Sequence, residues 1–368
     1  MENKRYDELN RLIKIWNEQG QDKHILQSLY NQANLSENFE VDRTEDIKQE
    51  TMFSGLTDLE LLERYEKKYF NKYTNRELKH LFQESHNRFM KDSNLQVTRN
   101  VVVKNNTEKQ SAIGWVSSSQ DYLYMNKYFI NRGKEQKDLN EIINEKSIGK
   151  IVLKTLLHET KHNIQYEDAI DFALGNKQDK DRAFAGALML INNTNFNLAA
   201  AESGEEYERY VKHWKDNYNY HAYEQEANFE ANKRVVSLYG MDYQNMRVDY
   251  AQALAQNAFA VFRFRPAGDP NLDKKMLADR VDKIEEYTKS QLEYFEKGAK
   301  DCEIKNRVSQ TMHSYIDRDE KGNSPLRDRL TKELDQMYTQ YTTAIDYLKK
   351  VKSEKEVEQI QDNMLLNF

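Results

Sequence analysis

The residues best suited to catalysis lie in the segment His158-Glu159-Thr160-Lys161-His162. Positions four apart on an α-helix lie one turn apart on the same face, so His158 and His162 can present both imidazoles to one metal ion. Glu159 lies about 100° around the helix, where its carboxylate can reach a metal-bound water without binding the metal. Zinc would lower the pKa of that water toward about 7 and polarise a carbonyl group. The segment therefore predicts a catalytic zinc site with Glu159 as general base.

A buried helix must hold these histidines, and the preceding residues have the composition of one. We expect a helix from Ile148 to Gln165, because apolar residues recur at helical spacing directly before the first histidine. These residues are Ile151, Val152, Leu153, Leu156 and Leu157. A fully solvated helix would not carry such a run beside two histidines.

A second predicted helix, from about His221 to Tyr239, carries the carboxylates that could complete the site. Glu224 and Glu226 are two residues apart, about 200° around a helix, so only one of them can face the metal. Glu224 is preferred, because Ala227 and Ala231 lie near its face and would allow a close approach to the histidine helix. Glu226 is the alternative metal ligand.

The sequence TLLHETKH at 155–162 resembles the active-site helix of zincin metallopeptidases, and EQEAN at 224–228 resembles the second metal-binding helix of the gluzincins. In that family the leading glutamate binds zinc, and an acidic residue one turn later orients a ligand histidine through its free ring nitrogen. The resemblance implies one catalytic Zn²⁺ held by His158, His162 and Glu224. Asn228 stands at the position of the orienting acid, and its uncharged amide would make the ligand histidine less basic.

The resemblance also implies a zinc metallopeptidase, with a protein or peptide as substrate. Glu159 would take a proton from the attacking water and later pass it to the leaving amine. Zincins resemble one another in an edge strand that binds the substrate backbone beside the active-site helix. The candidate for that strand contributes Tyr122, Tyr124 and Asn126.

A hydrogen-bond donor for the reaction's oxyanion is expected near the second helix. His221, one turn before Glu224, is the candidate catalytic residue, and Tyr220, Tyr223 and His213 are alternatives. The other histidines have no partner at metal-binding spacing and are interpreted as surface or structural residues: His24, His80, His86 and His313.

The composition predicts an α+β fold dominated by helices, because 38% of residues are hydrophobic, 32% are charged, and there are only 12 glycines and 3 prolines. We expect an N-terminal helical region at 1–90 and a zincin-like catalytic core at 91–265, with a helical insertion at about 168–218. Residues 266–368 are predicted to form a C-terminal hairpin or arm of two long helices, broken near 322–325.

Within the core, short β-branched or aromatic segments predict a small sheet packed on the active-site helix. They lie at 95–103, 112–116 and 122–125, and a charged linker follows at about 134–145. The pair Asp269-Pro270 predicts the start of the first C-terminal helix, since proline fits the first turn.

Charge and hydropathy limit the partners. The net charge of −6 provides no general attraction to nucleic acid, and no run of about 18 apolar residues could span a membrane. We expect no secretory signal at the N-terminus, where apolar residues recur among charges, and the single cysteine, Cys302, fits a reducing compartment. We therefore expect a soluble cytoplasmic protein, although export without a cleavable signal is compatible with the sequence. The C-terminal helices could serve partner binding or oligomerisation.

Two other functional hypotheses fit the same residues. The first is a catalytically degenerate, metal-stabilised zincin that acts as a regulatory or partner-binding protein. The second is an interaction protein without metal, in which the C-terminal helices make the contacts. Glu159→Gln separates an enzyme from the first alternative, and metal analysis separates it from the second.

Overall fold

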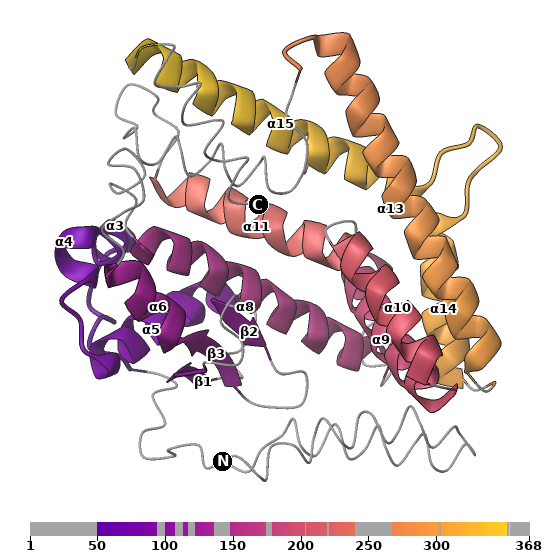
Figure 1. Cartoon of the computed structure of the whole chain (residues 1–368), viewed down its shortest axis with the longest axis horizontal. Helices are drawn as coiled ribbons and strands as arrows, with labels where there is room; N and C mark the ends of the chain where they lie inside the picture. The colour runs from indigo at the N-terminus through magenta and orange to yellow at the C-terminus, as the bar shows by residue number, and fades with distance from the viewer. Residues whose placement is uncertain are drawn as a thin grey trace.

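The computed structural model describes residues 50–93, 100–106, 113–116, 122–135, 148–173, 179–202, 204–218, 221–239, 267–299, 301, 303–351 and 353. This part of the chain is mainly helical, with one small mixed sheet, which confirms the predicted α+β class. Figure 1 shows the sheet and the N-terminal helices at the lower left and the C-terminal helices along the top and the right side. None of the described helices has both the length and the apolar character needed to cross a bilayer.

Helices α3 (Asp58–Glu63), α4 (Lys67–Phe70) and α5 (Asn75–Asp92) form the N-terminal region. α3 and α5 each begin with a capping box, in which a threonine and a glutamate three residues later satisfy each other's backbone N–H groups. α5 packs against the histidine helix. The N-terminal helices therefore form one wall behind the site.

Strands β1 (Asn100–Lys104), β2 (Gly114–Val116) and β3 (Tyr122–Asn126) form a sheet in the order β1-β3-β2. β3 pairs with β1 in parallel and with β2 antiparallel. The prediction that Tyr122, Tyr124 and Asn126 form a substrate-binding edge strand is therefore wrong. Because β3 has a hydrogen-bonded strand on each side, its backbone cannot pair with a peptide. Within the described sheet, β1 and β2 are the edges.

Helix α6 (Lys127–Glu135) directly follows β3 and was not expected. Its first residues lie between the predicted strand and the predicted charged linker. Most of that linker lies outside the described residues. On the face of the sheet toward the core, Leu123 and Met125 pack with Val101. The sheet is thus packed against the helices, as predicted.

The histidine helix, α8 (Ile148–Ala173), is two turns longer than predicted. Its residues Val152, Leu153, Leu156 and Leu157 are buried in the core as expected, but Ile151 is 38% exposed. The segment expected to be a helical insertion forms the end of α8, then α9 (Lys180–Glu202) and α10 (Gly204–Asn217).

Helix α11 (Ala222–Tyr239) begins one residue after the predicted start. It packs along α8, and Figure 1 shows it between α8 and the C-terminal helix α15. Ala227 and Ala231 are fully buried, in agreement with a close approach of the two helices. The helix that carries the acids therefore lies beside the helix that carries the histidines.

The C-terminal segment forms three described helices rather than two: α13 (Pro270–Gly298), α14 (Glu303–Ile316) and α15 (Pro325–Val351). Asp269 caps α13 and Pro270 occupies its first turn, as predicted. α13 and α14 pack against α9, so these helices belong to the body of the protein. The division of the chain into three regions and the oligomeric state stay predictions.

Candidate metal centre

Three side chains from two helices converge at the centre of the molecule. Nε2 of His158 lies 3.0 Å from Nε2 of His162. Oε2 of Glu224 lies 3.3 Å from the first of these nitrogens, and Oε1 lies 3.3 Å from the second. All three residues lie below the surface, with side chains 13%, 10% and 6% exposed. The predicted convergence of His158, His162 and Glu224 is confirmed, and the group could hold a metal ion.

The distances between the two imidazole nitrogens and the carboxylate oxygens are of the size expected around a tetrahedral zinc ion. Zinc bonds of about 2.0–2.1 Å at tetrahedral angles place neighbouring ligand atoms about 3.3 Å apart. The two imidazole nitrogens are 3.0 Å apart, and each has a different oxygen of the Glu224 carboxylate at 3.3 Å, so both nitrogens and the carboxylate lie close to this spacing. Two imidazoles and one carboxylate are also the donor set of catalytic zinc sites that keep a fourth position for water or substrate.

The local electrostatics favour a cation between these groups. Burial alone would lower the pKa of His162, but the adjacent Glu224 carboxylate raises it to about 9. Burial would conversely raise the pKa of Glu224, but the two imidazoles hold it well below its ordinary value. Glu224 also lies in the first turn of α11, where the helix dipole favours a negative charge. The cluster therefore binds positive charge, either a proton or a metal ion.

Glu226, the alternative ligand, belongs to a different group of charges. Its carboxylate lies 3.1 Å from Nζ of Lys161 and accepts a 2.6 Å hydrogen bond from Arg329 on α15. Although burial opposes ionisation, these two cations lower the pKa of Glu226 to about 2. The two acids of α11 therefore face different partners, as their spacing requires.

The hydrogen bond expected from Asn228 to a ligand histidine comes instead from Gln165. Nδ1 of His162 lies 2.8 Å from Oε1 of Gln165, which follows it by three residues on α8. Nδ1 of His158 is buried without a hydrogen-bond partner in the described part of the chain. The described structure shows no hydrogen bond from Asn228 to either ring, so its role stays a prediction, and the histidine helix itself provides an orienting group for His162.

Glu159 lies beside the cluster and next to the edge strand β2. Its charge contributes to the raised pKa of His162, so its carboxylate is near the two imidazoles. A Cβ atom on Gly114 would lie 3.3 Å from Cγ of Glu159 and 3.0 Å from Sδ of Met125. Glycine at this position lets the β2 backbone pass close to the predicted general base.

Tyr218, which the sequence reasoning missed, is the tyrosine at the centre of the site. It lies against Glu224, and burial together with the charges of Glu224 and Glu159 raises its pKa well above the ordinary value. Its hydroxyl therefore stays protonated at neutral pH. Among 23 tyrosines, no spacing distinguishes this one, because it lies between two helices.

His221 is placed differently from the predicted catalytic residue. Its side chain is fully buried, its Nδ1 lies 2.7 Å from the Tyr223 hydroxyl, and its ring stacks on Tyr287 at 4.6 Å. Burial lowers its pKa to about 4. In this structure the ring is enclosed by packing, and the catalytic role of His221 stays a prediction. Among the alternatives, His213 is exposed and Tyr220 lies outside the described residues.

His86 supports α8 from behind. This fully buried residue of α5 places Nδ1 2.9 Å from Oγ1 of Thr160, and burial lowers its pKa to about 4. Thr160 lies between the two histidines of the motif. The interpretation of His86 as a structural residue agrees with this contact.

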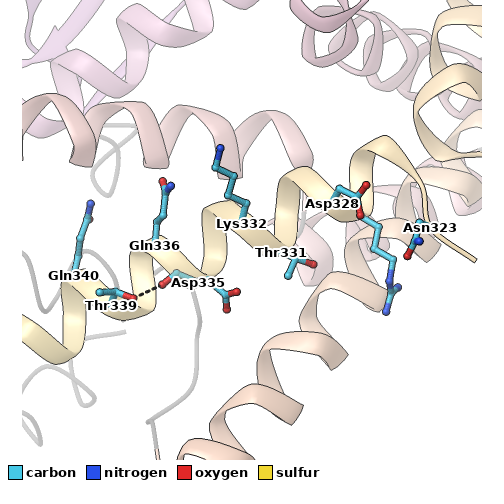
Figure 2. Close-up of a pocket in the computed structure, with 9 residues that line it drawn as sticks. Asn323, Asp328, Thr331, Lys332, Asp335, Gln336, Thr339 and Gln340 are labelled. Carbon is cyan, nitrogen blue, oxygen red and sulfur yellow. Dashed lines mark hydrogen bonds between the residues drawn. The ribbon is translucent and has the colours of Figure 1, made fainter.

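A large groove lies away from the cluster. It has a volume of about 810 Å³ and runs along α15, where Figure 2 shows the polar side chains that line it. Its lining residues include Asp328, Lys332 and Asp335, and none of the site residues described above. Its exposed, polar character indicates a solvated helix surface, so the metal cluster is the stronger candidate for chemistry.

The described fold therefore combines a helical body, a small sheet and a His-His-Glu group suited to a metal ion. In comparisons with known proteins, no family model, no curated protein and no solved structure matches this chain.

Proposed function

We propose that this protein is a zinc-dependent endopeptidase whose ion is held by His158, His162 and Glu224. The observation that carries the proposal is the convergence of two imidazole nitrogens and one carboxylate, with contacts of 3.0–3.3 Å between them, on a single position that could hold a metal ion. Glu159, next to the first histidine, supports hydrolysis over a purely structural metal site, because such a site needs no adjacent base.

When bound at this site, zinc would supply Lewis acidity toward a water and a substrate carbonyl. Glu159 accepts a proton from the attacking water and transfers it to the leaving nitrogen, so that it ends the cycle in its starting form. The Tyr218 hydroxyl donates a hydrogen bond to the substrate's carbonyl oxygen as negative charge develops on that oxygen. The raised pKa of Tyr218 supports this role, since the group must remain a donor.

The edge strand β2 is the proposed binding element for an extended peptide. It lies against α8, and Gly114 brings its backbone beside Glu159. In the described sheet β2 has β3 on one side only, so its other side can pair with a substrate backbone. This arrangement supports a peptide substrate rather than a small ester or amide.

Comparison of the wild type with Glu159→Gln tests the proposal. Both proteins should bind one zinc ion, but the variant should lose about 10²–10⁴-fold in cleavage rate, because only the general base is removed. Glu205→Gln is the matched control, since Glu205 is exposed on α10 and the change of charge is the same. New N-termini in a whole-proteome digest would report cleavage without a known substrate.

Two outcomes contradict the proposal in different ways. If the purified wild type binds no zinc after dialysis against the metal, the ligand assignment fails. If zinc binds but the wild type and Glu159→Gln produce the same N-termini, the protein is a metal-stabilised binding module and not a peptidase.

A further inference from the structure

The amide of Gln165 can adopt only one orientation in this structure. Its Nε2 group donates to the backbone carbonyl of Tyr223 at 3.0 Å and to the Glu226 carboxylate at 2.8 Å. Both partners are acceptors, so a flipped amide would bring its oxygen against two oxygens. Oε1 therefore faces His162, accepts a hydrogen bond from Nδ1–H, and leaves Nε2 to bind a metal.

The carboxylate that holds this amide is itself held from the C-terminal helix. Arg329 on α15 donates a 2.6 Å hydrogen bond to Oε1 of Glu226, while Oε2 of the same carboxylate receives the Gln165 amide. Arg329 also donates to Glu333 at 2.8 Å, which fixes the guanidinium on α15. Its side chain is 28% exposed and that of Glu226 only 13%. The pair is thus largely shielded from solvent, where such contacts are stronger than at the surface.

These contacts form a continuous chain from α15 through α11 to α8. We propose that Arg329 is a positioning residue of the metal site, which acts through Glu226 and Gln165 to orient His162. The proposal rests on the assignment of His162 as a metal ligand. It gives the C-terminal helix a part in the chemistry, although Arg329 is 103 residues from Glu226 in sequence.

Without Arg329, Lys161 would be the one cation left beside the carboxylate in the described structure, and it approaches the same oxygen at 3.1 Å. Glu226 would then be free to turn toward Lys161 and away from Gln165. The amide would lose one of the two contacts that define its orientation, and His162 would sample the wrong ring orientation. Loss of such outer partners commonly weakens metal binding by about 10–100-fold.

The test measures zinc affinity by competition with a chromophoric chelator. Gln165→Ala should weaken binding by about 10–100-fold, and Arg329→Ala by about tenfold, at the lower end of the same range. If Arg329 acts through Gln165, the double variant should bind no more weakly than Gln165→Ala alone, because the two effects share one path.

Arg327→Ala is the matched control, on the same helix. Arg327 is paired with Asp282 and Glu285 of α13 and has no contact with the metal cluster in the described structure. Its loss should lower thermal stability without a change in zinc affinity. If Arg329→Ala does not fold, Arg329→Gln retains most of the side-chain stem and should show the same loss of affinity.

The outcomes separate this proposal from the proposed function. If the wild type binds zinc and Arg329→Ala binds it as tightly as Arg327→Ala, the positioning role is refuted while the metal site stands. The role is also refuted if the losses from Gln165→Ala and Arg329→Ala multiply in the double variant. If the wild type itself binds no zinc, the metal site fails, and the positioning role fails with it.

Discussion

Metal binding at this site should release one proton near neutral pH. The pKa of His162 is about 9, whereas that of Glu224 is well below its ordinary value, so at pH 7 the imidazole carries the proton. Two pH units below its pKa, about 99% of a group is protonated. A metal ion must displace this proton to reach Nε2. The apparent zinc affinity should therefore rise about tenfold per pH unit from pH 7 and level off near pH 9.

Calorimetry of the apoprotein with zinc in two buffers of different ionisation enthalpy counts the protons released. We expect about one at pH 7 and about half of one at pH 9, the pKa of His162. Proton NMR of the apoprotein gives an independent check, since one histidine should titrate near pH 9. In Glu224→Gln the pKa of His162 should fall well below 9, because burial is then opposed only by the Glu159 charge and the Gln165 hydrogen bond.

Two results would refute this reasoning. The first is a zinc affinity that does not change between pH 7 and 9, with no proton released. The second is an unchanged histidine titration in Glu224→Gln, which would mean that the carboxylate does not lie against the imidazoles in solution. Either result would also remove the electrostatic argument for a cation site.

Two further predictions concern the site and its support. Tyr218→Phe should lower kcat about 10²–10³-fold while KM and zinc content stay near wild type. Steady-state kinetics and metal analysis would measure these quantities. An unchanged kcat would exclude Tyr218 as an oxyanion donor. Gly149→Ala should destabilise the fold by about 2–3 kcal/mol in urea unfolding, since its Cβ would overlap the carbonyl oxygen of Tyr65 and lie 2.8 Å from Phe70. Gly204→Ala is the control, because a Cβ atom there would meet no atom within 4 Å, and its free energy of unfolding should stay within about 1 kcal/mol of wild type. Equal effects of the two substitutions would refute the packing argument.

The parts of the site that follow from local helix geometry could be predicted from the sequence. The four-residue spacing of His158 and His162 requires only that the segment be helical, and the run of buried leucines supports that helix. The choice of Glu224 over Glu226 rested on the small residues Ala227 and Ala231, whose burial agrees with it. Gln165 was open to the same reasoning, since it lies one turn after His162.

The parts that depend on how distant elements meet could not be predicted. Three short strands with similar patterns do not reveal their order, so the central β3 was taken for an edge. The family pattern places the orienting contact at Asn228 on α11, whereas the amide that reaches His162 is that of Gln165 on the same helix, α8. Tyr218 and Arg329 reach the site from outside both motif helices, and no sequence spacing connects them with it.

The two acids of α11 illustrate how one short segment serves two purposes. Because Glu224 and Glu226 are two residues apart, a helix that aims the first at the imidazoles must aim the second elsewhere. The second then faces Lys161, inside the motif, and Arg329 on α15. Gln165 connects the two, since its amide contacts both His162 and Glu226. The rotation of α11 about its axis therefore determines both which acid can bind the metal and which acid anchors the C-terminal helix.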